Sequence, residues 1–398
     1  MPEPRYRVLA IGSHPVQYMA PLLRRMAQDP RLDLKVAYCT LRGAKPTHDP
    51  EFNVTVQWDV PLLEGYDWVE VPNRGSGSES FLGLHNPGLW KLIREGHFDA
   101  VLSYTGYPHS SFWISYAASK LSHAAFLFGT DATTLLPMVG PQWKKHIKRI
   151  AWPFLYRLAS QVIVPSSGTR DLMLSLGIPE ERITLTPYSV DNDWWLGRSQ
   201  EIDRAAVRAA WGIAPETAVI LFCAKLQPWK RPQDLLEAFA QSVLEKAVLI
   251  FAGEGPLRSD MVTKAQALGI ADRVRFLGFV NQTQLPALYT GADLLVLPSS
   301  YEAFGVVVNE AYLCACPVVA SDQVGAARDL IVPVNPALIY PCGDVGALAN
   351  ILRVLLADRQ RLRDLGNAAR QRMATWSPRE TITGTVEAIR NALQRRGD

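Results

Sequence analysis

Short, continuous apolar runs alternate with amphipathic stretches along nearly the whole chain. The apolar runs are typical of strands and lie at 8–12, 34–38, 100–104, 125–128, 162–165, 219–222, 248–252, 274–277 and 294–297. Segments with a helical period lie between them, at 19–28, 110–122, 143–159, 232–245, 257–268 and 306–315. Continuous apolar strands that alternate with helices indicate parallel sheets covered on both faces. The pattern therefore predicts an α/β fold built from doubly wound, Rossmann-like domains.

The length of 398 residues favours two domains. The segment 187–203 has no clear period, and the alternation of strands and helices restarts at Val219. We therefore expect an N-terminal domain over 1–195 and a C-terminal domain over 196–377. The last helical segment, within 378–398, is expected to cross back to the first domain.

Composition narrows the class of protein and its location. Hydrophobic residues make up 48% and charged residues 20%, as in a globular enzyme, and the net charge of 41 − 38 = +3 is too small to indicate a nucleic-acid partner. No run approaches the ~20 apolar residues of a membrane span, and the first apolar run is too short for a signal peptide. The five scattered cysteines fit buried thiols in a reducing compartment. We expect a cytoplasmic location.

The stretch 299–311 (SSYEAFGVVVNEA) carries the clearest chemical signal, because it follows a strand and opens a helix. Ligands of open α/β sheets lie just past the carboxyl ends of strands, and a helix N-terminus attracts phosphate. Glu302 and Glu310 could each reach hydroxyl groups of one ligand, as a nucleotide sugar would offer. The alternative is a pair of solvated helix carboxylates. The neighbouring Gly305 and the lysines described next favour the ligand site.

Two lysines, Lys225 and Lys230, follow the strand 219–222 and therefore lie at the same kind of edge. Two cations there would neutralise a diphosphate and help it to depart as a leaving group. The glycines of 253–255 (GEG) follow another strand and permit close approach of a backbone.

From the lysine loop onward, the second half of the chain resembles the retaining glycosyltransferases of family 4, which have the GT-B fold of two Rossmann-like domains facing a cleft. The motifs that carry the resemblance are, in order, GEGPLR (253–258), FLGFV (276–280), YTGADLLVLPS (289–299), the Glu-x7-Glu stretch, PVVAS (317–321) and YPCGD (340–344). They cover roughly half of the chain. The first domain is similar more loosely, through Gly12-Ser13 and 162–166 (VIVPS).

The resemblance implies an activity. A sugar would pass from a nucleotide-diphosphate sugar to an acceptor hydroxyl with retention of configuration, without a metal or other cofactor. The leaving phosphate would itself accept the proton of the acceptor hydroxyl. The acceptor would be a carbohydrate or lipid-linked carbohydrate, in polysaccharide or glycoconjugate biosynthesis.

The resemblance also implies roles for particular residues. It assigns catalysis to Glu302, Lys230 and Lys225. Glu302 would contact the donor sugar, Glu310 the ribose, and the backbone near Gly278 and Phe279 the base. The implied donor-binding set is Gly12, Ser13, Lys225, Lys230, Gly278, Phe279, Glu302, Ala303, Phe304, Gly305, Val306 and Glu310.

The chain departs from the family pattern at three places. Lys225 stands where arginine is usual, which keeps the charge but loses the planar fork. Gly129 or Thr130 stands where a histidine is frequent, and 188–191 reads YSVD in place of Asn-Gly-Val-Asp. Asp131 or His109 could take over the contact usually given to that histidine.

On the acceptor side the candidates are His14, His109 and Asp131, each in a segment that follows a strand. The alternative for the histidines is a hydrogen bond within their own loops. Asp131 could instead be the N-cap of a following turn.

Three further features have a plain and a specific interpretation. The segment 143–156 combines four cations with aromatic residues, as in a membrane-surface helix, but we favour a helix packed on its own domain with a solvated basic face. Asp191-Asn-Asp193 is interpreted as a linker and not as a metal site. Trp194-Trp195 is interpreted as packing between the domains and not as a sugar platform.

Other classes remain as alternatives. A GT-B sugar-nucleotide epimerase would need further carboxylates, and a phosphorylase would need a further phosphate site or cofactor. A nucleotide-sugar-binding protein without turnover is the alternative outside enzymes. An oxidoreductase is disfavoured, because no G-x-G-x-x-G follows the first strand.

Overall fold

The computed structural model describes residues 4–49, 54–136 and 140–397. Contacts divide the chain into two compact units. Unit 1 comprises Met1–Pro46, Pro61–Ser189 and Pro378–Asp398, and unit 2 comprises Thr47–Val60 and Val190–Ser377. The division differs from the expected ranges in two places, since unit 2 begins at Val190 and also includes Thr47–Val60.

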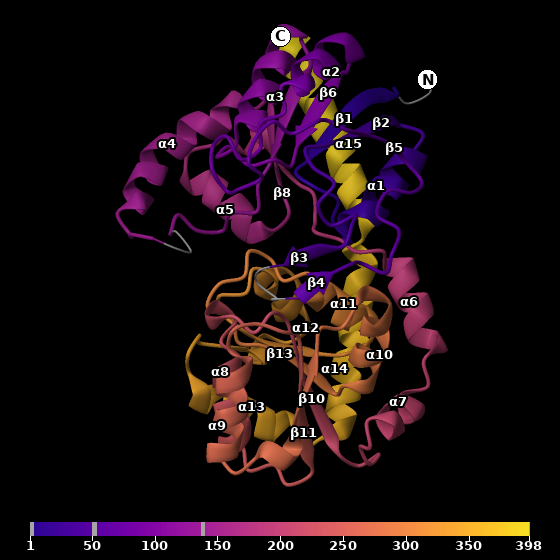
Figure 1. Ribbon diagram of the computed structural model, residues 1–398, viewed down its shortest axis with the longest axis vertical. Helices are drawn as coiled ribbons and strands as arrows, with labels where there is room; N and C mark the ends of the chain where they lie inside the picture. Colours follow the sequence, from indigo (N-terminus) through magenta and orange to yellow (C-terminus); the bar gives the residue numbers. More distant parts are fainter. Residues whose placement is uncertain (1–3, 50–53, 137–139, 398) are drawn as a thin grey trace. The chain divides into compact units, whose positions relative to one another are not determined.

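Unit 1 is built on a parallel sheet of seven strands in the order β5-β2-β1-β6-β7-β8-β9 (Figure 1). The strands are β1 (Tyr6–Gly12), β2 (Leu32–Tyr38), β5 (Asp67–Glu70), β6 (Ala100–Ser103), β7 (Ala125–Gly129), β8 (Gln161–Val164) and β9 (Ile183–Leu185). The chain builds outward from β1 to β2 and β5 and then returns to place β6 on the other side of β1. This reversal is a topological switch point, where open α/β sheets bind ligands.

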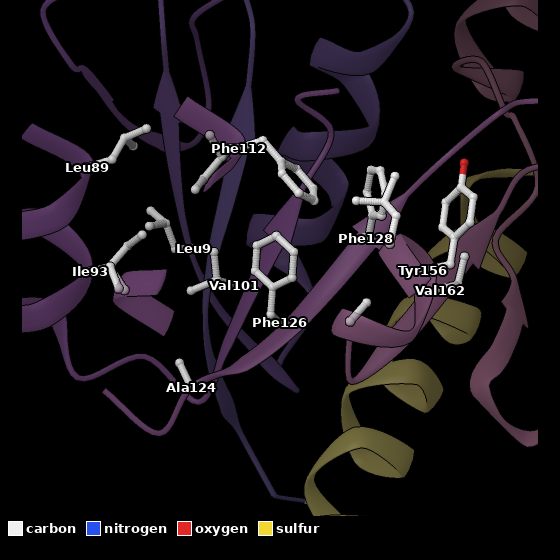
Figure 2. Close-up of a cluster of buried hydrophobic side chains, with 14 of the residues drawn as sticks. Leu9, Leu89, Ile93, Val101, Phe112, Ala124, Phe126, Phe128, Tyr156 and Val162 are labelled. Carbon is white, nitrogen blue, oxygen red and sulfur yellow. The ribbon is translucent and has the colours of Figure 1, made fainter. Parts of the chain in front are cut away.

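Alternate residues of β1 point to opposite faces of the sheet, as the period of a strand requires. Leu9 and Ile11 join a core closed by α2 (Gly88–Gly96), α3 (Ser110–Leu121), α4 (Lys144–Leu158) and α5 (Ser167–Ser175). Figure 2 shows aromatic rings of α3, β7 and α4 meeting in this core, and the rings of Phe112 and Phe128 are 4.7 Å apart between centroids.

The other face of the same sheet is covered by the helices α1 (Met19–Gln28) and α15 (Pro378–Gly397). Val8 and Ala10 of β1 lie in this core together with Ile389, which is fully buried. Gly384 lets α15 approach β9, because a Cβ at this position would lie 2.3 Å from the Leu185 carbonyl oxygen. The last helix of the sequence is thus an integral layer of unit 1.

Unit 2 has a parallel sheet of six strands in the order β12-β11-β10-β13-β14-β15. The strands are β10 (Ala218–Cys223), β11 (Ala247–Ala252), β12 (Val274–Gly278), β13 (Leu294–Leu297), β14 (Val318–Ser321) and β15 (Ile339–Tyr340). The helices are α6 (Asn192–Glu201), α7 (Arg204–Ala210), α8 (Pro232–Gln241), α9 (Arg258–Ala267), α10 (Leu285–Gly291), α11 (Val307–Leu313), α12 (Val332–Val334), α13 (Val345–Leu356) and α14 (Arg359–Arg372). The switch point of this sheet lies between β10 and β13.

A small antiparallel ladder, β3 (Thr47–Asp49) with β4 (Val54–Val56), belongs to unit 2 although it precedes most of unit 1 in sequence. The residues after β4 attach to the loop that follows β12. The Asn281 side-chain amide donates to the Gln57 carbonyl over 2.7 Å, and the Trp58 and Phe279 rings are 6.0 Å apart. Specific side-chain contacts of this kind leave no periodic trace in a sequence.

The expected linker 187–203 contains a helix. Asp191 is the N-cap residue of α6, and Asn192 and Asp193 are its first residues. Trp195 of α6 is buried and packs on Tyr289 within unit 2, at 5.9 Å between rings. This ring contact of Trp195 lies within one unit, and its interpretation as packing between the domains stays a prediction. No helix among the described residues is both long and apolar enough to cross a membrane.

Candidate active site

The loops that leave β10 and β13 flank the switch point of unit 2. Lys230 ends a 3-10 turn, Pro228–Lys230, in the first loop, and Glu302 lies in the second. The Ser300 N–H donates to the Trp229 carbonyl over 2.7 Å and ties the two loops together. Both loops leave the same edge of a parallel sheet, so residues far apart in sequence become neighbours.

Lys230 and Glu302, 72 positions apart, form an ion pair. Their side chains are 17% and 19% exposed. The Ser299 hydroxyl lies 3.4 Å from the same Glu302 oxygen and donates to it. Glu302 precedes α11 and is not part of it. The alternative of two solvated helix carboxylates is therefore wrong for this residue.

The turn from Ala303 to Val306 requires glycine at its centre. Gly305 has φ +98°, and a Cβ there would lie 3.2 Å from Glu302 Cγ. Other residues rarely adopt this conformation. The Val308 N–H donates to the Gly305 carbonyl over 2.9 Å, so helical bonding begins at Gly305. Backbone N–H groups at the start of a helix make no hydrogen bond within the helix, and they point out of its N-terminal end.

The backbone of this turn is held firmly on its other side. The Gly325 N–H donates to the Glu302 carbonyl over 3.0 Å, and the Ala326 N–H donates to the Phe304 carbonyl over 2.7 Å. The buried Phe304 ring stacks on Trp376 with an interplanar angle of 5°. These contacts fix the backbone that carries the Glu302 side chain.

Glu310 is buried on α11 and accepts a hydrogen bond of 2.9 Å from the Tyr289 hydroxyl. Burial raises the pKa of Glu310 to about 7, while hydrogen bonds from Tyr289 and Gln282 act in the opposite direction. Removing a carboxylate from water penalises its charged form, and the hydrogen bonds favour it. Near neutral pH both the protonated and the charged form of Glu310 are therefore populated.

The loops after β10, β11 and β12 pack backbone against backbone. A Cβ on Gly253 (φ +144°) would lie 2.0 Å from the Ala224 carbonyl oxygen, and the Gly253 N–H donates to the Gly278 carbonyl over 2.7 Å. Lys225 follows Ala224 directly. The lysine loop and Gly278 are therefore held on either side of the Gly253 loop.

Unit 1 has a cavity of about 270 Å³ at the carboxyl ends of its strands. Gly12, Ser13 and His14 line it after β1, and Asp131 lines it after β7. The Ser13 hydroxyl lies 3.0 Å from His14 Nδ1. Burial, and to a lesser degree the charge of Arg42, lower the pKa of His14, while Glu79 raises it. Two residues of the implied donor-binding set, Gly12 and Ser13, and two acceptor-side candidates, His14 and Asp131, thus line one cavity of unit 1.

Tyrosines that were not expected from the sequence complete this cavity, namely Tyr18, Tyr38, Tyr104 and Tyr188. The Tyr188 hydroxyl donates to Asp131 over 3.3 Å, and the Tyr18 ring meets Tyr188 edge-on at 5.9 Å. No helix follows Asp131 directly, so the N-cap alternative is wrong. Two signals were present, since Tyr104 directly follows a strand and Tyr188 replaces the usual asparagine of the family.

His109 does not line this cavity. It lies at the start of α3, where its Nδ1 donates to the Ser80 carbonyl over 3.1 Å. Its Nε2 is 3.7 Å from the Glu79 carboxylate. Both ring nitrogens of His109 thus interact with residues of another loop, Glu79 and Ser80, and not with its own loop as the alternative had it. Among the residues that the structure describes, no group of three or more His, Cys, Asp and Glu side chains could hold a metal ion.

Two family models match the chain. Residues 17–194 match Glycosyltransferase Family 4, and residues 203–372 match Glycosyl transferases group 1. A relative from Catenulispora acidiphila, named D-inositol 3-phosphate glycosyltransferase 2, is 28% identical over a match that covers 95% of this chain and 90% of the relative.

Solved structures resemble the whole chain. Anabaena Alr3699/HepE in complex with UDP and glucose has a TM-score of 0.71 and 21% identity, covering 99% of this chain and 98% of that one. A glycosyltransferase from Rickettsia africae has a TM-score of 0.73 and 16% identity, covering 98% and 99%. Together with the two parallel sheets, these likenesses show the α/β GT-B fold. The chain belongs to the group 1 and family 4 glycosyltransferases.

Proposed function

We propose that this glycosyltransferase moves a sugar from a nucleotide-diphosphate sugar to a carbohydrate hydroxyl with retention of configuration. The observation that carries the proposal is the partly buried Lys230–Glu302 pair at the switch point of unit 2. A cation and a carboxylate in contact there offer one group for a departing phosphate and one for sugar hydroxyls.

Lys230 would turn part of its hydrogen bonding from Glu302 to the diphosphate. An ammonium has three N–H donors, so it can keep the carboxylate and bind a phosphate oxygen together. Lys225 would add a second positive charge from the same loop. Charge that develops on the leaving diphosphate is thereby stabilised by the protein's own cations, and no metal is required in this proposal.

The two carboxylates would divide the donor between them. Glu302 would accept hydrogen bonds from the sugar near the reacting carbon. Glu310 would accept from the ribose, and Tyr289 would keep its carboxylate oriented. The backbone of the Ala303–Val306 turn would hold the diphosphate and sugar, and Gly278 and Phe279 would face the base.

Retention would follow from attack on the face that the leaving group departs from. The bond between the anomeric carbon and the phosphate oxygen breaks, and the acceptor oxygen bonds to that carbon. The proton of the acceptor hydroxyl passes to the departing phosphate oxygen, so no protein base is consumed. HepE, which has been solved with UDP and glucose, supports the class of donor. Family membership supports a role in polysaccharide or glycoconjugate synthesis.

Removing either half of the ion pair tests the site. Glu302→Gln and Lys230→Ala should each lower transfer at least a hundredfold without unfolding the protein, because each deletes a contact to the reacting groups. The measurement is release of nucleoside diphosphate from UDP-, GDP- and ADP-sugars, with candidate acceptors and in the presence of a chelator. The Glu237–Lys264 ion pair of the same unit provides the control, and Glu237→Gln and Lys264→Ala should leave the rate unchanged.

The same assay separates the alternatives. An epimerase would convert the donor without an acceptor, and a binding protein would release no nucleotide with any donor. Near-normal transfer by both site variants would mean that the site lies elsewhere.

We also propose that α4 contacts an anionic lipid surface, as suits a lipid-linked acceptor. Trp143, Ile147, Ile150 and Phe154, spaced along one helical face, are 58%, 54%, 70% and 67% exposed. Trp152, Leu155 and Tyr156 anchor the opposite face in the core. In Figure 1, α4 lies at the outer edge of unit 1. The helix packs on its domain as favoured from the sequence, but its exposed face is apolar as well as basic.

Lys144, Lys145, Lys148 and Arg149 make the N-terminal half of α4 strongly positive. An apolar stripe beside such a basic face is the composition of helices that lie in a lipid interface. Binding to anionic vesicles is the measurement that checks this contact. Activity at the inner face of the cytoplasmic membrane would follow from it.

A further inference from the structure

The cavity of unit 1 has a chemical character that limits what can enter it. Its lining combines tyrosine rings and small hydroxyl-bearing residues, among them Ser13 and Thr130, with aliphatic side chains such as those of Leu22, Leu23 and Val36. At about 270 Å³ it is slightly smaller than the roughly 300–1,000 Å³ of pockets for drug-sized molecules. One ring with several hydroxyl groups fits these dimensions and partners.

The charged side chain among the described lining residues of the cavity is an acidic one. Asp131 is its acidic lining residue, and no lysine or arginine is among the described residues that line it. The field of Asp131 reaches inside, since its charge adds to burial in raising the pKa of Tyr18 to about 12 and acts in the same direction on Tyr188. An anion entering the cavity would therefore meet repulsion.

The histidine of the cavity does not supply a compensating charge. Burial lowers the pKa of His14, so its imidazole is neutral at physiological pH. Arg42, whose positive charge acts on His14, is not part of the lining, whereas Asp131 is. Glu79 opposes the effect of Arg42 on His14.

We propose that this cavity receives an uncharged polyhydroxylated ring of the acceptor and excludes rings that carry a phosphate or carboxylate. The inference rests on the proposed transfer to a carbohydrate, whose acceptor class it narrows. It separates this chain from relatives named for D-inositol 3-phosphate, a ring that carries a phosphate. Tyrosine faces would pack on the apolar side of a sugar ring, the lining hydroxyl groups would donate and accept at its edge, and the Asp131 carboxylate would accept.

Discrimination in such a site comes from repulsion as much as from attraction. A phosphate on the ring would lie near Asp131 with no cation in the lining to pair with it. A neutral ring avoids this repulsion, and the lining offers it hydroxyl groups such as those of Ser13 and Thr130 as hydrogen-bond partners.

Paired probes test the proposal without any need for turnover. Saturation-transfer NMR titrations of the full chain would compare myo-inositol with D-inositol 3-phosphate, and glucose with glucose 6-phosphate. We expect each neutral probe to bind at least tenfold more tightly than its phosphate. Equal or tighter binding of the phosphates would overturn the proposal.

Charge variants test whether the preference for neutral over phosphorylated rings arises at Asp131. Asp131→Lys should abolish or invert the tenfold preference, and Asp131→Asn should reduce it about threefold. Asp272→Lys makes the same charge change on an exposed residue of unit 2 and should leave the ratio unchanged. Arg42→Ala should also leave it unchanged. A preference that ignores both Asp131 variants, or that is lost in Arg42→Ala, would overturn the assignment to this cavity.

The outcome is distinguishable from failure of the proposed transfer. If no donor sugar is transferred but neutral rings bind as expected, the function fails while the ligand preference of the cavity stands. If transfer is observed but phosphorylated rings are the better acceptors, the function stands and the cavity proposal fails.

Discussion

At the scale of the residue, Glu310 couples stability to pH. Its folded pKa of about 7 lies above the ordinary value of 4.5. Between these values the native state binds more protons than the unfolded state, so the free energy of unfolding falls as pH rises. The stabilisation is complete below pH 4.5 and is lost as pH rises through 7.

Glu310→Gln should remove this dependence. The difference in unfolding free energy between wild type and Glu310→Gln should shift against wild type by on the order of 3 kcal/mol between pH 4.5 and 7.5. Urea unfolding at a series of pH values measures it. Tyr289→Phe removes a hydrogen bond that favours the carboxylate and should move the transition to higher pH. Parallel pH profiles for wild type and Glu310→Gln would show that Glu310 does not carry the effect.

At the scale of the element, α4 exposes an apolar stripe, for which we propose contact with a lipid surface. Serine at Trp143, Ile147, Ile150 and Phe154 should lower partition onto phosphatidylserine vesicles at least tenfold, because the apolar stripe supplies the insertion. Co-sedimentation measures the partition, and added salt should weaken it through the lysines. Binding by the stripe variant at the wild-type level would contradict the contact.

A matched control removes exposed apolar side chains elsewhere. Trp90, Leu121, Val262 and Val354 are 43%, 56%, 37% and 46% exposed, and serine at these positions should not change vesicle binding. Failure of the wild-type protein to bind any anionic vesicle would also reject the proposal. If vesicle binding were lost only in the control variant, the lipid-binding surface would lie at the control positions and not on α4.

Prediction from sequence succeeded for strands that are buried on both faces of a sheet, because such strands are apolar along their whole length. The central strands β1, β7 and β10 are continuous apolar runs and were located to within two residues. The edge strand β5 was not predicted, because it reads DWVE and is not a continuous apolar run, whereas the edge strand β12 was predicted at 274–277. The helix α6 also escaped, since its two tryptophans and Gly197 give no regular apolar stripe.

The candidate site follows the same division. Lys230 and Glu302 could be placed at one edge because parallel topology brings strand ends together. The cavity of unit 1 could not be foreseen, since its tyrosines come from separate loops and its volume depends on how their rings pack. His109 follows a strand as His14 does, but a hydrogen bond to the Ser80 carbonyl of another loop orients its ring.

At the scale of the whole molecule, unit 1 depends on the last helix of the chain. Ile389 of α15 is fully buried against the sheet of unit 1. Ile389→Ala should lower the free energy of unfolding by about 2–5 kcal/mol, because it leaves a cavity in that core. Thr383→Ala changes an exposed position of the same helix and should stay within about 0.5 kcal/mol.

Hydrogen exchange would show which strands lose stability in Ile389→Ala. Amides of β7 and β8, which pack under α15, should exchange faster in Ile389→Ala, and those of β10 and β11 in unit 2 should not. Uniform acceleration in both sheets would instead indicate that the two units unfold as one.

The return of α15 to unit 1 also sets an order of events during synthesis. A ribosome completes every residue of unit 2 before it reaches Pro378, whereas the sheet of unit 1 waits for that last helix. Until then the face that carries Val8 and Ala10 lacks the cover of α15. The domain translated second can therefore finish folding first, and the nascent chain carries an open apolar sheet face until α15 is made.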